Sequence, residues 1–239
     1  LKGILVSPEY GTPFLAATQV FDIRPVPRKW LAIEKTSKAE NRFVQQGSIL
    51  VTCSGAVGRA TIATNAIDSI LVSHDLLRVE PNEAGQWGWI YAYLRSPQCR
   101  AMMTSAQYGH IIKHLETSHL DALPVPAVSR SIALDFMAKA EQILTLRNAA
   151  NNSIKEAESL FESAVGIISP SAPDSGFSVP ASAMFHKRMR MEASFHAPYP
   201  STVIERMKKA GRKIDPLSEV TDRVWWMARF KRFYGDAGI

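Results

Sequence analysis

The pattern of apolar and polar positions in the first half of the chain predicts short β-strands. An apolar run at residues 48–52 is followed by a glycine-containing turn at 53–58 and by an alternating run at 59–63. This order predicts a β-hairpin. Two further apolar runs, at 69–73 and 76–79, predict additional strands.

The pattern then changes to a helical one. Apolar residues recur at helical steps over residues 87–103, and residues 115–120 predict another short helical turn. Residues 1–128 are therefore expected to form a mixed α+β module.

A long helix is predicted over residues 129–165, which contain neither Gly nor Pro and many strong helix formers. Small or apolar residues recur there at alternating steps of three and four, the spacing of a coiled coil, and Arg147 alone breaks it. Because Ala fills every other position of this seam, a partner helix could approach closely in an antiparallel pair. The alternative is an amphipathic helix that lies on its own domain. The residues expected to pair are Phe136, Ala140, Ile143, Ala150, Ile154, Ala157 and Phe161.

Prolines on both sides delimit this helix, with Pro124 and Pro126 before it and a Pro- and Gly-containing stretch after it. The segment near residues 230–239 resembles the segment at 1–12, which indicates tandem modules in a fragment of a longer protein. The last residues could instead complete the first module, as in a circular permutation. The expected domains are an incomplete first module at 1–128, a coiled-coil spacer helix at 129–168, a linker at 169–182 and the incomplete beginning of a second module at 183–239.

Charge is distributed unevenly along the chain. Residues 1–182 carry 16 Lys+Arg and 16 Asp+Glu, whereas residues 183–239 carry 12 and 6, so the whole net charge of +6 lies in the second part. A basic segment of this kind suits a polyanion such as nucleic acid, although solubility alone is an alternative explanation. The apolar content of 46% is ample for a buried core.

Cysteine spacing and hydropathy indicate the cellular compartment in which the protein is expected. Cys53 and Cys99 have no spacing typical of a zinc site or a disulfide framework, so a reducing cytoplasm is expected. No apolar run has the length of a membrane span, and no membrane association is expected.

Catalytic, cofactor and metal motifs are not recognised. Gly55 and Gly58 do not form a phosphate loop, because Arg59 and Ala60 stand where Lys and Ser or Thr are needed, and positive φ in a turn is their expected role. The chain has no Pro-Pro for an adenine-N6 methyltransferase motif and no Asp/Glu-x-Lys tripeptide for a common metal-dependent nuclease. His110 and His114 lack a third ligand at suitable spacing. No cofactor, metal or catalytic residue is therefore expected.

An ordered set of short motifs carries a family resemblance. In chain order the motifs are GTPFL at 11–15, GSIL at 47–50, SGAVGR at 54–59, VSHDL at 72–76, Gly109, LDALPVP at 120–126, MEASF at 191–195 and PLSEV at 216–220. This set resembles the target-recognition domains of type I restriction-modification specificity subunits. In that family a recognition domain is followed by a long helix, a second recognition domain and a second helix, and the order here is similar.

The resemblance implies a non-catalytic subunit that binds double-stranded DNA in a sequence-specific manner. It further implies methyltransferase (modification) subunits and restriction/translocase subunits as partners, a bipartite target, and a possible homodimer through the long helix. Two alternatives stay open: a coiled-coil scaffold whose basic segment serves solubility or assembly, and a recognition domain of a single-chain restriction-methylation enzyme.

Contacts to DNA are expected from cations and polar side chains on loops, because Lys and Arg neutralise phosphates and polar groups reach base edges. The pair Trp225–Trp226 is expected in a core, with base stacking as the alternative. The candidate DNA-binding residues are Arg24, Arg28, Lys29, Ser54, Arg59, Gln107, His110, Lys113 and His114.

Overall fold

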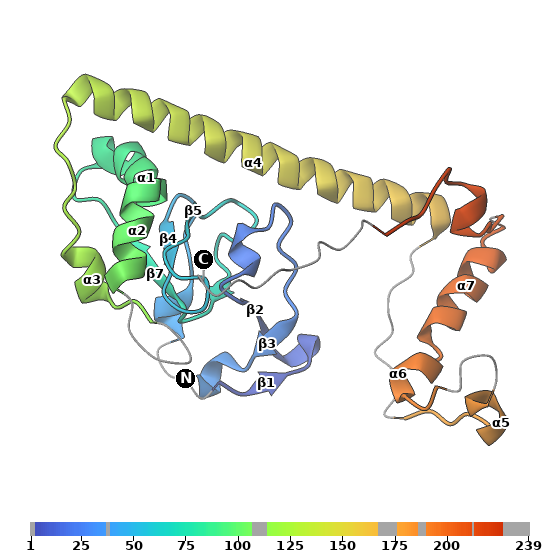
Figure 1. Ribbon diagram of the computed structural model, residues 1–239. Helices are drawn as coiled ribbons and strands as arrows, with labels where there is room; N and C mark the ends of the chain where they lie inside the picture. The colour runs from blue at the N-terminus through green and yellow to red at the C-terminus, as the bar shows by residue number, and fades with distance from the viewer. Residues whose placement is uncertain are drawn as a thin grey trace, which may run out of the picture. The chain divides into compact units, whose positions relative to one another are not determined.

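The computed structural model describes residues 3–36, 39–106, 114–166, 176–185, 190–211 and 213–226 (Figure 1). The chain divides into two compact units, Leu1–Ala157 and Glu158–Ile239, and each is described by itself. Within the described residues the fold is mixed α+β, as predicted: two small sheets precede a long helix and further helices. None of the described helices is long and apolar enough to cross a membrane.

The first sheet has the strand order β1-β3-β2-β6. β1 and β2 are antiparallel to β3, and β6 is parallel to β2. Its strands are β1 (Leu5–Val6), β2 (Thr12–Leu15), β3 (Lys29–Leu31) and β6 (Leu71–Val72).

The second sheet has the order β5-β4-β7, with both neighbours antiparallel to the central β4. The predicted hairpin is confirmed, because β4 pairs with β5 in a register that places Leu50 opposite Thr61. The strand predicted at 76–79 is also confirmed. The strands are β4 (Ile49–Thr52), β5 (Ala60–Ile62) and β7 (Leu76–Val79).

β4 is buried on both faces and separates two apolar cores. Successive side chains of a strand point to opposite faces. Val51 therefore packs with Tyr91 in one core, whereas Leu50 packs with Leu15 and Val72 in the other. In Figure 1 the helices α1 and α2 lie on one side of this sheet, and β2 and β3 lie on the other.

The helical stretch predicted at 87–103 forms two helices, α1 (Trp87–Arg95) and α2 (Pro97–Ala106). The break falls at Ser96, which has extended backbone angles because the residue before a proline is disfavoured in a helix. α3 (Thr117–Asp121) follows, with a capping box between Glu116 and His119. Short 3-10 helices lie at Pro8–Tyr10, Gln19–Phe21, Ile33–Lys35, Glu40–Arg42 and Ala84–Gln86.

The predicted long helix is confirmed as α4 (Arg130–Val165). The first part of α4 lies on its own module, as the alternative interpretation of its pattern held. Ala133 and Ala140 are buried, and Leu144 packs against the core that contains Tyr91. The crossing with α1 is close, since a Cβ added at Gly88 would lie 2.4 Å from the Cα of Met137.

Polar side chains anchor α4 further along the same face. Arg147 donates a 2.7 Å hydrogen bond from Nη1 to Oγ1 of Thr61, in β5. The backbone N–H of Asn65 donates to Oδ1 of Asn148 (2.9 Å), and Asn151, which is 0% exposed, donates from Nδ2 to Oδ1 of Asn65 (3.4 Å). Burial is the largest cause that lowers the pKa of Arg147. The residue that interrupts the predicted seam therefore anchors the helix to the module.

The second unit has no buried residue among those described. The prediction of a core position for Trp225 and Trp226 is wrong, because their side chains are 61% and 89% exposed. The guanidinium of Arg223 lies 4.7 Å from the ring centroid of Trp225. The helices of this unit are α5 (Ala181–Met184), α6 (Ala193–His196) and α7 (Tyr199–Lys209), with a 3-10 helix at Leu217–Glu219.

Candidate nucleic-acid interface

The turn between β4 and β5 displays two of the predicted contact residues. Gly55 and Gly58 have φ of 65° and 75°, so both adopt the positive φ expected of them. Thr52 holds the turn closed, since its Oγ1 accepts from the backbone N–H of Arg59 (3.0 Å) and donates to the carbonyl of Ala56. This rigid turn presents Ser54 at its beginning and Arg59 at its end.

Ser54 belongs to a polar cluster built from three parts of the chain. Its Oγ donates to Oδ1 of Asp75 (2.7 Å), and Oγ of Ser73 donates to Oδ2 of the same carboxylate (2.6 Å). Nε2 of His74 lies 3.8 Å from Asp75 Oδ1, and His114 forms a backbone bridge with Ser54. We call these five residues the Ser54–Asp75 cluster. It joins the end of β4, the β6–β7 turn and the segment before α3.

The carboxyl group of Asp75 is ionised at neutral pH. Partial burial raises its pKa, but the hydroxyl hydrogen bonds from Ser73 and Ser54 and the charges of His74 and His114 outweigh burial, so the pKa lies below its usual value of 3.8. Both serine hydroxyls donate their hydrogen bonds to this carboxylate. Ser54 is therefore not arranged as a nucleophile, which would need its hydroxyl hydrogen-bonded to a base such as histidine.

Arg59 is held against the connection between β2 and β3. Its guanidinium lies 4.1 Å from the ring centroid of Phe21, a cation–π arrangement. The same connection is fixed by Gln19, whose Oε1 accepts from the N–H of Ala16 (2.9 Å) and whose Nε2 donates to the carbonyl of Val26 (2.6 Å).

Three other predicted cations lie on this connection or directly after it. Arg24 is partly exposed, Arg28 is exposed, and Lys29 is exposed at the start of β3. The structure thus brings Arg59 to the connection that carries Arg24 and Arg28, and it brings Ser54 to His114.

Three predicted contact residues, Gln107, His110 and Lys113, lie outside the described residues. His114 is described and exposed. Among the residues that the structure describes, no group of three His, Cys, Asp or Glu side chains is placed to hold a metal ion. Burial raises the pKa of the Cys53 thiol, which keeps it protonated and poorly nucleophilic.

A groove beside the Ser54–Asp75 cluster contains residues that were not predicted from the sequence. Its volume is about 240 Å³, and it shares Ser73 and His74 with the cluster. Its lining also includes Arg42 and Arg78, which come from different elements. The one available signal was Arg78 itself, a lone charge within the apolar run of β7.

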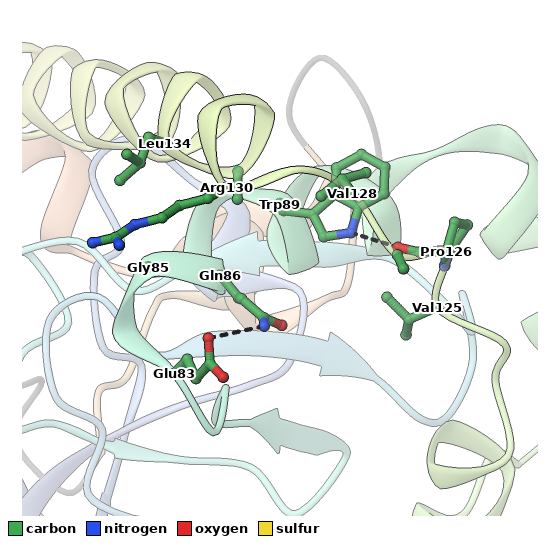
Figure 2. Close-up of a pocket in the computed structure, with 11 residues that line it drawn as sticks. Glu83, Gly85, Gln86, Trp89, Val125, Pro126, Val128, Arg130 and Leu134 are labelled. Atoms are coloured by element: carbon green, nitrogen blue, oxygen red, sulfur yellow. Dashed lines mark hydrogen bonds between the residues drawn. The ribbon is translucent and has the colours of Figure 1, made fainter.

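A larger cavity of about 660 Å³ lies away from the cluster, at the start of α4 (Figure 2). Trp89 lines it and donates from Nε1 to the carbonyl of Pro126 (3.1 Å), while Nε2 of Gln86 donates to Oε2 of Glu83 (3.1 Å). Arg130 lines it from the first turn of α4. In this cavity the indole of Trp89 and the amide of Gln86 each donate to another lining residue.

No protein-family model and no curated protein sequence matches the chain. Among solved structures, it is similar to the HsdS subunit from Thermoanaerobacter tengcongensis, with 17% identity and a TM-score of 0.42 over 62% of this chain and 34% of that one. The type I restriction-modification S subunit from M. genitalium gives 14% identity and a TM-score of 0.40 over 68% and 38%. A third structure, from a study of complex assembly in the type I R-M system, has 17% identity and a TM-score of 0.33, and the match covers 68% of this chain and 41% of that one.

The chain spans 34% to 41% of the length of these proteins. It is structurally similar to type I specificity subunits over about 65% of its own length, at low sequence identity.

Proposed function

We propose that the chain is a DNA-recognition module of the specificity-subunit kind, which directs methyltransferase and restriction/translocase subunits to a bipartite target. The observation that carries this proposal is the Ser54–Asp75 cluster. It offers an ionised carboxylate, two serine hydroxyls and two histidines on turns at one end of a rigid sheet. Such a set can accept and donate hydrogen bonds at base edges.

The contacts divide into two kinds by their chemistry. Arg24, Arg28, Lys29 and Arg59 bind phosphates, which positions the module without sequence preference. Ser54, Asp75 and His114 read base edges, together with the residues proposed from the sequence in the neighbouring segment, which are Gln107, His110 and Lys113. A carboxylate at Asp75 is suited to a cytosine amino group.

Catalysis belongs to partner subunits in this proposal. Ser54 donates its hydroxyl to Asp75 rather than to an imidazole, and the thiol of Cys53 is held protonated. Neither residue is therefore arranged to attack DNA or to accept a methyl group.

We further propose that the face of α4 next to its contact with the module pairs with another long helix, either of a second module or of a second copy of the chain. Phe136, Ile143 and Phe161 are 36%, 40% and 57% exposed, whereas Ala140 already packs into the module. Ala150, Ile154 and Ala157 continue the same pairing face. With 36 residues and a rise of about 1.5 Å per residue, α4 is long enough to separate two recognition modules by more than one DNA turn.

Substitutions at the two kinds of contact test the DNA proposal. Ser54→Ala should cost about 1–3 kcal/mol of binding free energy at one base pair of the target and little elsewhere, whereas Arg28→Ala should weaken binding to all duplexes alike. Uniform effects of both substitutions would favour the coiled-coil scaffold, which binds DNA without sequence preference. Binding to a panel of single-base-pair variants of the target measures the difference.

A further inference from the structure

The groove beside the Ser54–Asp75 cluster is lined by two arginines from separate elements. Arg42 is the last residue of the 3-10 helix Glu40–Arg42, and Arg78 lies in β7. Leu76 and Arg78 are two residues apart and so point to the same face of the strand. The buried apolar residues Leu76 and Val72 also line the groove, together with His74 and Asn41.

Neither arginine forms an ion pair within the part of the chain that the structure describes. The carboxylate whose charge acts on Arg78 is that of Glu80, two residues further along the chain. Partial burial lowers the pKa of Arg78, and the charge of Glu80 only partly opposes this. Arg78 is exposed and Arg42 is half-buried, so both guanidinium groups are accessible, and a bound anion would add charge-assisted hydrogen bonds to each of them.

The size of the groove indicates which anion fits. At about 240 Å³ it lies below the range of roughly 300–1,000 Å³ typical of sites for organic ligands. Two guanidinium groups that line one small groove suit a compact tetrahedral oxyanion, because each can donate two parallel hydrogen bonds.

We propose that Arg42 and Arg78 together bind a single backbone phosphate of the DNA duplex. This inference rests on the proposed function. Because the groove shares Ser73 and His74 with the Ser54–Asp75 cluster, a phosphate held there fixes the distance between the DNA backbone and the base-reading side chains. The arginine pair is thus a positioning device for the cluster.

The test compares Arg42→Gln, Arg78→Gln, the double variant and the control Lys155→Gln in the full chain. Lys155 is an exposed cation of α4 that does not line the groove. Binding to a random-sequence duplex is measured as a function of salt concentration. Each single variant should weaken binding roughly tenfold and reduce the salt slope by about one. The double variant should also reduce the slope by about one, because only one phosphate is lost. A reduction of about two, or variants that behave like the control, would overturn the proposal.

A second measurement separates this inference from the proposed function. Inorganic phosphate is titrated into the wild-type chain while the guanidinium Nε–H signals of Arg42 and Arg78 are followed by NMR. Saturable shifts of both signals are expected. Shifts without duplex binding would leave the anion site standing and reject the DNA function, whereas duplex binding without shifts or slope changes would reject the site alone. The absence of all three would reject both.

Discussion

Gly88→Ala should weaken the attachment of α4 to its module. A Cβ at position 88 would lie 2.4 Å from Cα and N of Met137 and from the carbonyl oxygen of Phe136. All three are backbone atoms of α4, and normal carbon contacts are about 3.5–4.0 Å. No side-chain rotation can relieve this contact, so one helix must move.

Two opposing effects set the magnitude. Replacing Gly by Ala inside a helix is worth up to about 1 kcal/mol of stability, and less in the first turn, where Gly88 lies. Overpacking of this kind costs about 1–3 kcal/mol. Displacing α4 would also expose Ala140 and lengthen the 2.7 Å hydrogen bond between Arg147 and Thr61. We therefore expect a net loss of about 2 kcal/mol.

The assay is urea denaturation of the full chain, combined with hydrogen exchange at the amides of residues 133–151. Gly85→Ala is the matched control, because a Cβ there meets nothing within 4 Å. Gly88→Ala should lower the unfolding midpoint and speed exchange in α4, while the control changes neither. A Gly88→Ala variant as stable as wild type, with unchanged exchange, would refute the close crossing of α1 and α4.

Three further predictions concern charge and assembly. Arg59→Ala should weaken binding to every duplex and reduce the slope of log affinity against log salt concentration by about one. If affinity is unchanged when Arg59 and Lys113 are both replaced by alanine, the proposed DNA face is wrong. Asp75→Asn should cost about 1 kcal/mol of stability at neutral pH. The pKa of Asp75 in the folded protein lies below the usual 3.8, so the extra stability of the wild type is complete above that pH and disappears as the pH falls through the lowered pKa. An equal difference in stability between the wild type and Asp75→Asn at pH 7 and pH 2 would argue against the hydrogen bonds to the carboxylate. The chain should dimerise through α4 and become monomeric with Ile143→Glu and Ile154→Glu while the first module stays folded, and sedimentation that finds a wild-type monomer at high concentration would contradict the pairing.

Local patterns predicted the elements of this fold better than their contacts. The β4–β5 hairpin and α4 follow from periodicity and turn residues, which act over a few positions. The face that α4 buries was not determined in this way. Positions 133, 140 and 147 lie both on the predicted seam and on the face that meets the module, so one repeat is compatible with two partners. Asn151 is buried although it is polar: its Nδ2 donates to Oδ1 of Asn65, while its own Oδ1 has no hydrogen-bond partner among the described residues.

The candidate site was predictable only in part. Ser54, Arg59 and His114 belong to motifs or loops with evident polar chemistry. Three strands, β4, β5 and β6, separate Arg42 from Arg78 in the sequence, and the juxtaposition of the two arginines depends on the pairing of β4 with β7 and on the position of the 3-10 helix Glu40–Arg42. The carboxylate of Asp75 accepts hydrogen bonds from two serines that lie in different segments, Ser54 and Ser73. Such non-local contacts have no periodic signal.

Selection from a random duplex library tests the central proposal most directly. The full chain, alone and together with methyltransferase subunits, is used to capture DNA, and the captured duplexes are sequenced and assayed for methylation. The account predicts enrichment of one defined sequence, tighter capture with the methyltransferase present, and no methylation by the chain alone when S-adenosylmethionine is supplied. Capture without any enriched sequence, or methylation by the isolated chain, would contradict it.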